Sequence, residues 1–180
     1  ANPFPSGLDI NPGDGSWTTT NVEASAWVWD HTQNNYRYGS IAANNGSGNG
    51  GNYPGLFRYI AMGQGIFIRT TGPDASLVWN TSARHHLNQD PYKKNSEREE
   101  SILPYVMLEA SNELSFSDIA FISFGEDGTT GFENGLDISK LFGGVTAPQL
   151  YMVNGEYQLS ANYLASLEED ETRVVPLYYR

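Results

Sequence analysis

The stretch Val22-Glu-Ala-Ser-Ala-Trp-Val-Trp-Asp30 carries the clearest strand pattern in the chain. Side chains on a β-strand point alternately to opposite sides, so a period of two in hydrophobicity indicates a strand. One side of this run is small and aliphatic and the other holds two indoles: Val22, Ala24, Ala26 and Val28 against Ser25, Trp27 and Trp29. The run therefore predicts a strand with an aliphatic face and an aromatic face.

Further runs with strand character follow at short intervals, separated by Gly, Pro, Asn and Asp. They span residues 36–42, 56–61, 65–71, 76–80, 102–110, 118–125, 149–153, 157–161 and 173–179. Helical character is limited to short turns near residues 138–142 and 161–167. Strands at this spacing, without crossover helices, predict an all-β fold: an antiparallel β-sandwich of jelly-roll type with about ten strands and little helix. In the run 65–71, Ile66 and Ile68 oppose Phe67, which predicts a central strand.

The composition excludes several classes of function. The chain has 180 residues, with 10 Lys and Arg against 21 Asp and Glu, and a formal net charge of −11. This balance disfavours nucleic acids and anionic membranes as partners, because neutralising phosphates requires Lys and Arg. The absence of Cys excludes disulfides, thiolate metal sites and thiol catalysis. The length suits a single module over residues 1–180, and no apolar run approaches the roughly 20 residues of a membrane-spanning helix.

Motifs for catalysis are weak. Gly46, Gly48 and Gly51 match a GxGxxG spacing, but they lie among asparagines, without the preceding strand and following helix of a dinucleotide site. The histidines form no metal-binding spacing, and a GxSxG nucleophile elbow is absent. A pair of carboxylates for glycoside hydrolysis is set by spatial separation rather than by sequence, so a hydrolase stays the alternative. We expect no enzymatic activity and assign no catalytic residues.

Two acidic stretches are candidates for a metal site. In Asp9-Ile-Asn-Pro-Gly-Asp14, side-chain oxygens recur as at the start of a calcium loop, although the later EF-hand positions do not match. The second stretch spans residues 126–137. We expect a structural Ca²⁺ with ligands among Asp9, Asn11, Asp14 and Asp137. In this hypothesis the cation, or Lys140, links the two stretches, whereas the alternative is that the acids separately cap turns.

Aromatic residues are the candidates for a binding surface. Two tryptophans share one side of the run 22–30 and two tyrosines share a side of the run 36–42, so neighbouring strands would form a platform of four rings. An exposed platform would stack on sugar rings, whereas a buried one would belong to the core. A tyrosine after the Asn- and Gly-rich stretch 44–52 and a further tryptophan extend the set. The candidate ligand-binding residues are Trp27, Trp29, Tyr36, Tyr38, Tyr53 and Trp79.

Several stretches, in order along the chain, resemble a module of secreted Bacteroidetes proteins that usually precedes the sorting signal of the type IX secretion system. The opening Asn2-Pro-Phe-Pro-Ser-Gly-Leu-Asp9 is similar to its "GNPYPSxID" start. The stretch 129–141 is similar to a second, acidic motif of the module, with Glu133 where Asp is usual. Weaker matches lie at residues 26–30, 63–69, 84–86 and 175–177.

This resemblance implies a non-catalytic accessory module that is secreted or displayed at the cell surface. The chain starts without a signal peptide, so we expect it to be cut from a longer protein with covalently linked neighbouring domains. Together with the aromatic candidates, the resemblance predicts a module that binds polysaccharide or a cell-surface glycan. The alternative is a structural spacer or adhesion domain without a small ligand.

Overall fold

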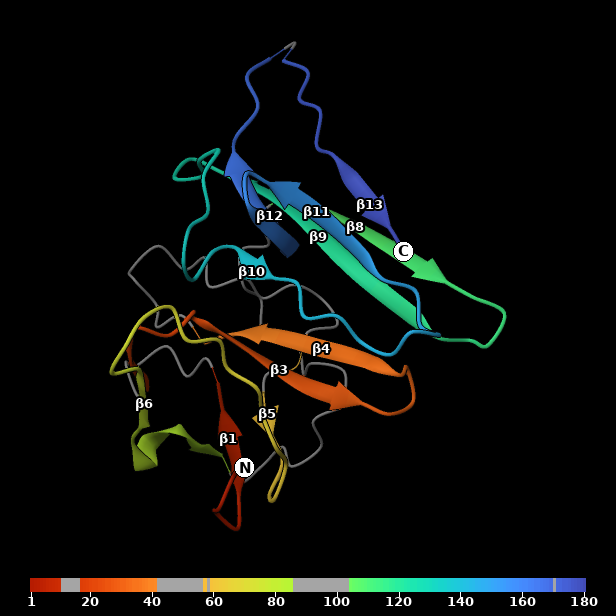
Figure 1. The fold of residues 1–180 in the computed structure, drawn as a ribbon. Helices are drawn as coiled ribbons and strands as arrows, with labels where there is room; N and C mark the ends of the chain where they lie inside the picture. Colours follow the sequence, from red (N-terminus) through yellow and green to blue (C-terminus); the bar gives the residue numbers. More distant parts are fainter. Residues whose placement is uncertain (11–16, 42–56, 58, 86–103, 170) are drawn as a thin grey trace. The chain divides into compact units, whose positions relative to one another are not determined.

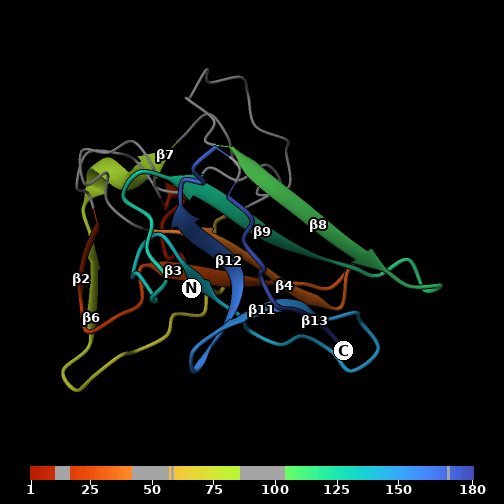
Figure 2. The same cartoon turned by 90° about the horizontal axis from the view of Figure 1, so that it is seen from above.

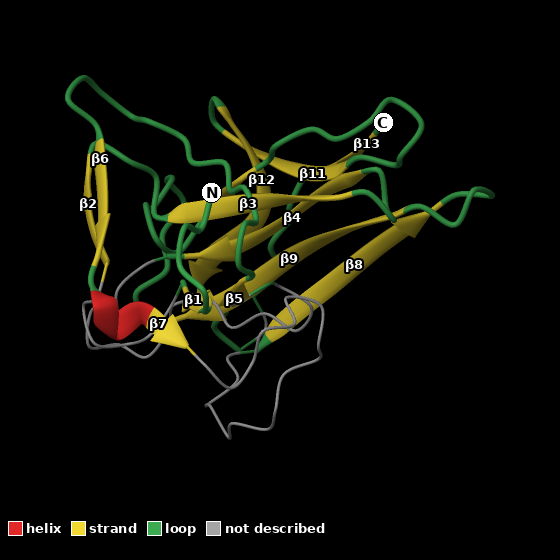
Figure 3. Ribbon diagram, turned by 90° about the horizontal axis from the view of Figure 1, so that it is seen from below, coloured by secondary structure: helices red, strands yellow, loops and turns green. Residues whose placement is uncertain are grey.

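The computed structural model describes residues 1–10, 17–41, 57, 59–85, 104–169 and 171–180. Within these ranges the chain forms β-strands and one 3-10 turn, Thr81–Ala83, which is red in Figure 3. No helix in the described ranges is long and apolar enough to cross a membrane. The predicted all-β fold class is confirmed. The chain divides into two compact units, Ala1–Trp29 with Arg37–Ser101 and Asp30–Tyr36 with Ile102–Arg180, and the single module over residues 1–180 stays a prediction.

The first unit contains short strands paired in twos and threes (Figure 1). The three-stranded sheet has the order β5 (Tyr59–Ile60), β1 (Gly7–Asp9), β7 (Arg84–His85). The two-stranded sheets are β2 (Trp17–Thr20) with β6 (Ser76–Trp79), and β3 (Ser25–Asp30) with β4 (Asn35–Ser40). The tip of the β3–β4 hairpin, residues 30–36, is grouped with the second unit.

The aliphatic side of the run 22–30 is buried at Val22, Ala26 and Val28 and partly buried at Ala24. Ala26 and Val28 on β3 belong to a cluster of buried apolar residues that also contains Leu8, Ile10, Trp17, Ile41, Phe57, Ile60 and Ala83. The regular strand begins at Ser25, three residues later than the alternation. Burial of this aliphatic side is what holds β3 in the first unit.

The run 65–71 is not a central strand, so that prediction is wrong. Its backbone forms two isolated bridges, Trp27 with Phe67 and Val22 with Thr70. The side chains of Phe67 and Ile68 are 49% and 38% exposed. A central strand requires continuous ladders of hydrogen bonds on both edges, and apolar residues at successive positions do not supply them.

The second unit contains one mixed sheet, seen from above in Figure 2. Its strand order is β13 (Leu177–Tyr179), β11 (Leu150–Asn154), β12 (Tyr157–Ala165), β9 (Ser117–Gly125), β8 (Tyr105–Ser111), and β10 (Ile138–Ser139) also pairs with β12. The apolar core of this sheet consists of Leu150, Met152 and Leu164 with Ala120 and Ile122.

The helical turns predicted near residues 138–142 and 161–167 are wrong. Strand β10 begins at Ile138, and strand β12 continues to Ala165.

One strand pair departs from the predicted antiparallel arrangement. β9 and β12 run parallel, with Phe121 beside Ala161 and Gly125 beside Ala165. A parallel pair requires a crossover connection, and here the chain between the two strands carries β10 and β11. Local turn residues indicate hairpins between consecutive strands, but they hold no information on a pairing across such a distance.

Candidate functional site

Three aromatic rings and one guanidinium gather at the β11–β13 edge of the second unit. Tyr151 lies directly opposite Tyr178, and their rings stack with centroids 5.5 Å apart and an interplanar angle of 17°. Phe142 meets Tyr151 edge-on at 5.3 Å and 81°, and the guanidinium carbon of Arg180 lies 5.8 Å from the Phe142 ring centroid. We call these four residues the aromatic cluster.

The alternation of the two strands explains why these side chains meet. Leu150 and Met152 are buried in the apolar core, so Tyr151 between them points to the other side of the sheet. Tyr178 shares that side as the partner of Tyr151, and Arg180, two residues further on, shares it as well. The Tyr178 side chain is 46% exposed. The cluster therefore offers one half-exposed ring, supported from behind by a second ring.

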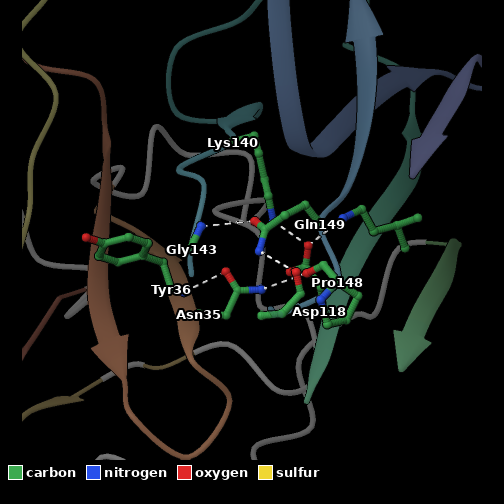
Figure 4. Close-up of polar contacts among 9 residues, drawn as sticks. Asn35, Tyr36, Asp118, Lys140, Gly143, Pro148 and Gln149 are labelled. Carbon is green, nitrogen blue, oxygen red and sulfur yellow. Dashed lines mark hydrogen bonds and ion pairs between the residues drawn. The ribbon is translucent and has the colours of Figure 1, made fainter. Parts of the chain in front are cut away.

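The loop that carries Phe142 is held at both ends by one buried carboxylate, shown in Figure 4. Asp118 on β9 accepts a hydrogen bond from the Lys140 ammonium at the start of the loop, and one from the Leu150 amide at its end, 2.6 Å away. The Asp118 and Lys140 side chains are almost fully buried. Burial lowers the pKa of Lys140, and the charge of Asp118 acts in the opposite direction. Asp118 thus closes the loop from residue 140 to residue 150.

Side-chain amides fix the interior of the same loop. Gln149 accepts a hydrogen bond from the Gly143 amide at 3.0 Å, directly after Phe142. Asn35 donates to the Pro148 carbonyl at 3.3 Å, and the Gly144 amide donates to the Asn34 carbonyl at 2.8 Å. A Cβ on Gly143 would lie 2.7 Å from the Asn35 Cα, so the close approach of the two segments requires glycine. The backbone around Phe142 is therefore fixed by hydrogen bonds on several sides.

The platform proposed from the sequence is divided between interior and surface. β3 and β4 are neighbours, as that prediction requires. Trp27 is only 3% exposed and Tyr38 is also buried, whereas Trp29 is 39% exposed. Tyr36 is half-buried. The rings of Trp27 and Tyr38 are thus inaccessible to a ligand in solution, whereas Trp29 is exposed and Tyr36 is partly accessible.

The remaining aromatic candidates lie elsewhere. Trp79 on β6 packs against Trp17 with ring centroids 5.3 Å apart, and the Trp17 indole donates to the Asp9 carbonyl at 2.7 Å. Tyr53 lies outside the described residues. Trp79 therefore packs within the first unit, and the role of Tyr53 stays a prediction.

The predicted metal ligands are distributed over both units. Asp9 is a buried residue of the first unit, Asp137 is buried in the second, and Asn11 and Asp14 lie outside the described residues. The Asp137 carboxylate accepts hydrogen bonds from the Glu133 amide at 2.8 Å and the Tyr163 amide at 2.7 Å, which is the turn-capping role of the alternative hypothesis. Among described residues, no three acidic or histidine side chains gather as a metal site would require. The calcium site stays a prediction.

The expected role of Lys140 as a link between Asp9 and Asp137 is wrong. Its ammonium contacts Asp118 instead. An ammonium removed from water needs a carboxylate at hydrogen-bonding distance, and Asp118 supplies it across the sheet. Asp118 begins the predicted strand 118–125, and an acidic residue at the start of a strand is ordinarily exposed. The sequence therefore does not indicate that Asp118 pairs with Lys140.

Comparison with known proteins finds no matching family model, curated protein or solved structure.

Proposed function

We propose that this chain is a non-catalytic module of an exported protein, and that it binds polysaccharide or a cell-surface glycan through the aromatic cluster. The observation that carries the proposal is the Tyr151–Tyr178 stack at the edge of the sheet, whose outer ring is half-exposed. The resemblance of the opening residues to an exported module supports the location.

The chemistry of the cluster suits a sugar ring. A pyranose has apolar C–H faces that pack on an aromatic face, and its hydroxyls hydrogen-bond to polar groups at the rim. Tyr178 has few rotatable bonds and is already stacked on Tyr151, so its side chain loses little conformational entropy when a ligand binds. The loop that carries Phe142 reduces the entropic cost of binding further, because hydrogen bonds fix it before a ligand binds.

The alternative function is a spacer or adhesion domain without a small ligand. In that case the exposed rings would have no affinity for soluble glycans. The two functions differ in one measurable property, the retardation of the protein in a native gel that contains polysaccharide.

The experiment compares the wild type with two tyrosine variants in gels containing plant, algal or host polysaccharides. Tyr178→Ala removes the exposed ring of the cluster, while Tyr157→Ala removes an exposed ring that stacks on Phe132 at 4.4 Å, on the opposite side of the β11–β12 pair. We expect retardation of the wild type and Tyr157→Ala by at least one polysaccharide, and its loss in Tyr178→Ala. Equal mobility of all three proteins in every gel would overturn the proposal in favour of a spacer.

A further inference from the structure

Arg180 is held in place beside the exposed ring. Its backbone N–H donates to the Gln149 carbonyl at 3.0 Å, and its carbonyl accepts from the Gln149 amide at 2.9 Å. Its side chain leaves β13 on the same side as Tyr178, and its guanidinium lies over Phe142. The positive charge is therefore positioned at the rim of the aromatic cluster rather than free to sample the solvent.

The other cations of the second unit are neutralised. Lys140 is buried against Asp118. Arg173 contacts the Glu171 carboxylate at 2.7 Å and donates to the Ala165 carbonyl at 2.9 Å. Arg180 makes no ion pair with a carboxylate among the described residues, although the chain carries a net charge of −11. A guanidinium without a carboxylate partner in the described part of so acidic a chain is available for an anionic ligand.

We propose that the glycan bound by the aromatic cluster is acidic, and that Arg180 binds the carboxylate of a uronic acid residue while Tyr178 stacks on a sugar ring. This inference rests on the proposed function, because it assigns the ligand class of the same site. The planar guanidinium offers paired N–H donors that match a carboxylate in a bidentate manner. Its carbon lies 5.8 Å from the Phe142 ring centroid, so a cation–π contact holds the guanidinium beside the aromatic cluster.

The competing ligands are a neutral glycan and a sulfated glycan. With a neutral glycan, Arg180 contributes only packing on Phe142, and removing its charge changes little. With a sulfated glycan, the charge matters but the planar carboxylate geometry does not, so Lys serves almost as well as Arg. The net charge of −11 repels any polyanion, so an acidic glycan binds only where the local contact with Arg180 exceeds this repulsion. At matched charge density the repulsion is equal for the carboxylated and the sulfated polymer, so it does not separate them.

The experiment measures affinity by calorimetry for polygalacturonate and for the same polymer with its carboxylates reduced to alcohols, in the presence of a chelator. A sulfated galactan forms the third arm. Charge-assisted hydrogen bonds to a carboxylate predict about ten- to a hundredfold tighter binding of the acidic polymer than of its reduced form. Arg180→Gln should abolish this preference, and Arg180→Lys should restore only part of it.

Three other outcomes would overturn one or both proposals. Equal affinity for the acidic and reduced polymers, unchanged by Arg180→Gln and lost in Tyr178→Ala, overturns the acidic ligand and leaves the proposed function standing. Tighter binding of the sulfated galactan, with full rescue by Arg180→Lys, overturns the uronic acid. Absence of binding in all arms, for a wild type that also shows no gel retardation, overturns both proposals together.

Discussion

Trp27 on β3 and Tyr151 on β11 occupy comparable positions in their strands. Each is an aromatic residue between two apolar neighbours that belong to a buried core, Ala26 and Val28 in one case, Leu150 and Met152 in the other. Trp27 is nevertheless almost completely buried, whereas the ring stack that begins at Tyr151 continues to a half-exposed Tyr178. The alternation of a strand thus fixes which side chains share a face, but whether that face is covered depends on the segments that pack on it.

The difference predicts that the two regions divide stability and binding between them. The β3 ring should matter for folding and the β13 ring for ligand affinity. Substitutions at Asp118, Trp27 and Gly143, with their control variants, test this division and the loop that carries Phe142, in decreasing order of expected effect.

Asp118→Ala should have the largest effect. It leaves the Lys140 ammonium buried without its carboxylate and the Leu150 amide without its acceptor. Breaking a buried ion pair on one side costs about 3–5 kcal/mol of unfolding free energy, and the lost amide acceptor adds about 1–3 kcal/mol. Urea unfolding measures the loss. The double variant Asp118→Leu with Lys140→Met should recover part of it, and a loss below about 1 kcal/mol in Asp118→Ala would contradict the role of Asp118 in closing the loop.

The same variant should also depend on pH in a defined direction. Burial lowers the pKa of Lys140 from its usual 10.5 and Asp118 raises it, so only the lowering remains in Asp118→Ala. Between the lowered pKa and 10.5 the unfolded chain binds more protons than the folded one, and the unfolding free energy therefore rises with pH. The deficit of Asp118→Ala against the wild type should shrink as the pH is raised from neutral towards 10.5.

Trp27→Ala should lower the unfolding free energy by about 3–5 kcal/mol, because it empties a buried site of indole size. The Trp27 Nε1 has no acceptor among the described residues, so Trp27→Phe removes volume but no hydrogen bond and should cost less. Tyr178→Ala is the counterpart at the surface, where substitutions change stability by about 0.5 kcal/mol or less. Thermal unfolding and gel retardation, measured on all three, should show opposite rankings. A Trp27→Phe variant that folds normally but no longer binds glycan would break the comparison.

Gly143→Ala should have the smallest of the three effects, a loss of about 1–3 kcal/mol typical of overpacking. The added Cβ would meet the Asn35 backbone, so the loop must shift and carry Phe142 with it. Gly65→Ala in the first unit is the matched control, because its Cβ would meet no heavy atom within 4 Å. Unfolding in urea and glycan affinity should both decline in the first variant and stay unchanged in the second. Equal stability of the two variants would show that the loop tolerates displacement.

Local features of the fold were predictable from the sequence. The run 118–125 corresponds to β9 at Ser117–Gly125, and the run 149–153 to β11 at Leu150–Asn154, because alternation and turn residues act over a few positions. The pairing of β11 with β13 and the parallel pairing of β9 with β12 were not predictable, since they join distant segments. The aromatic cluster was missed for the same reason. Tyr151 and Tyr178 lay in predicted strands, but nothing in the sequence indicated that these strands are neighbours.

The tip of the β3–β4 hairpin has a consequence for how the chain acquires its structure during synthesis. Gln33 bonds to Ser117 across 84 positions, while Asn34 bonds to Thr146 across 112 and Asn35 to Pro148 across 113. Contacts between such distant residues slow folding, because a long loop must close before they form. During synthesis from the N-terminus, Gln33 therefore lacks this partner until residue 117 has been made, and Asn34 and Asn35 lack theirs until residues 146 and 148 have been made. The loop that carries Phe142 is consequently among the last parts of the molecule to become ordered.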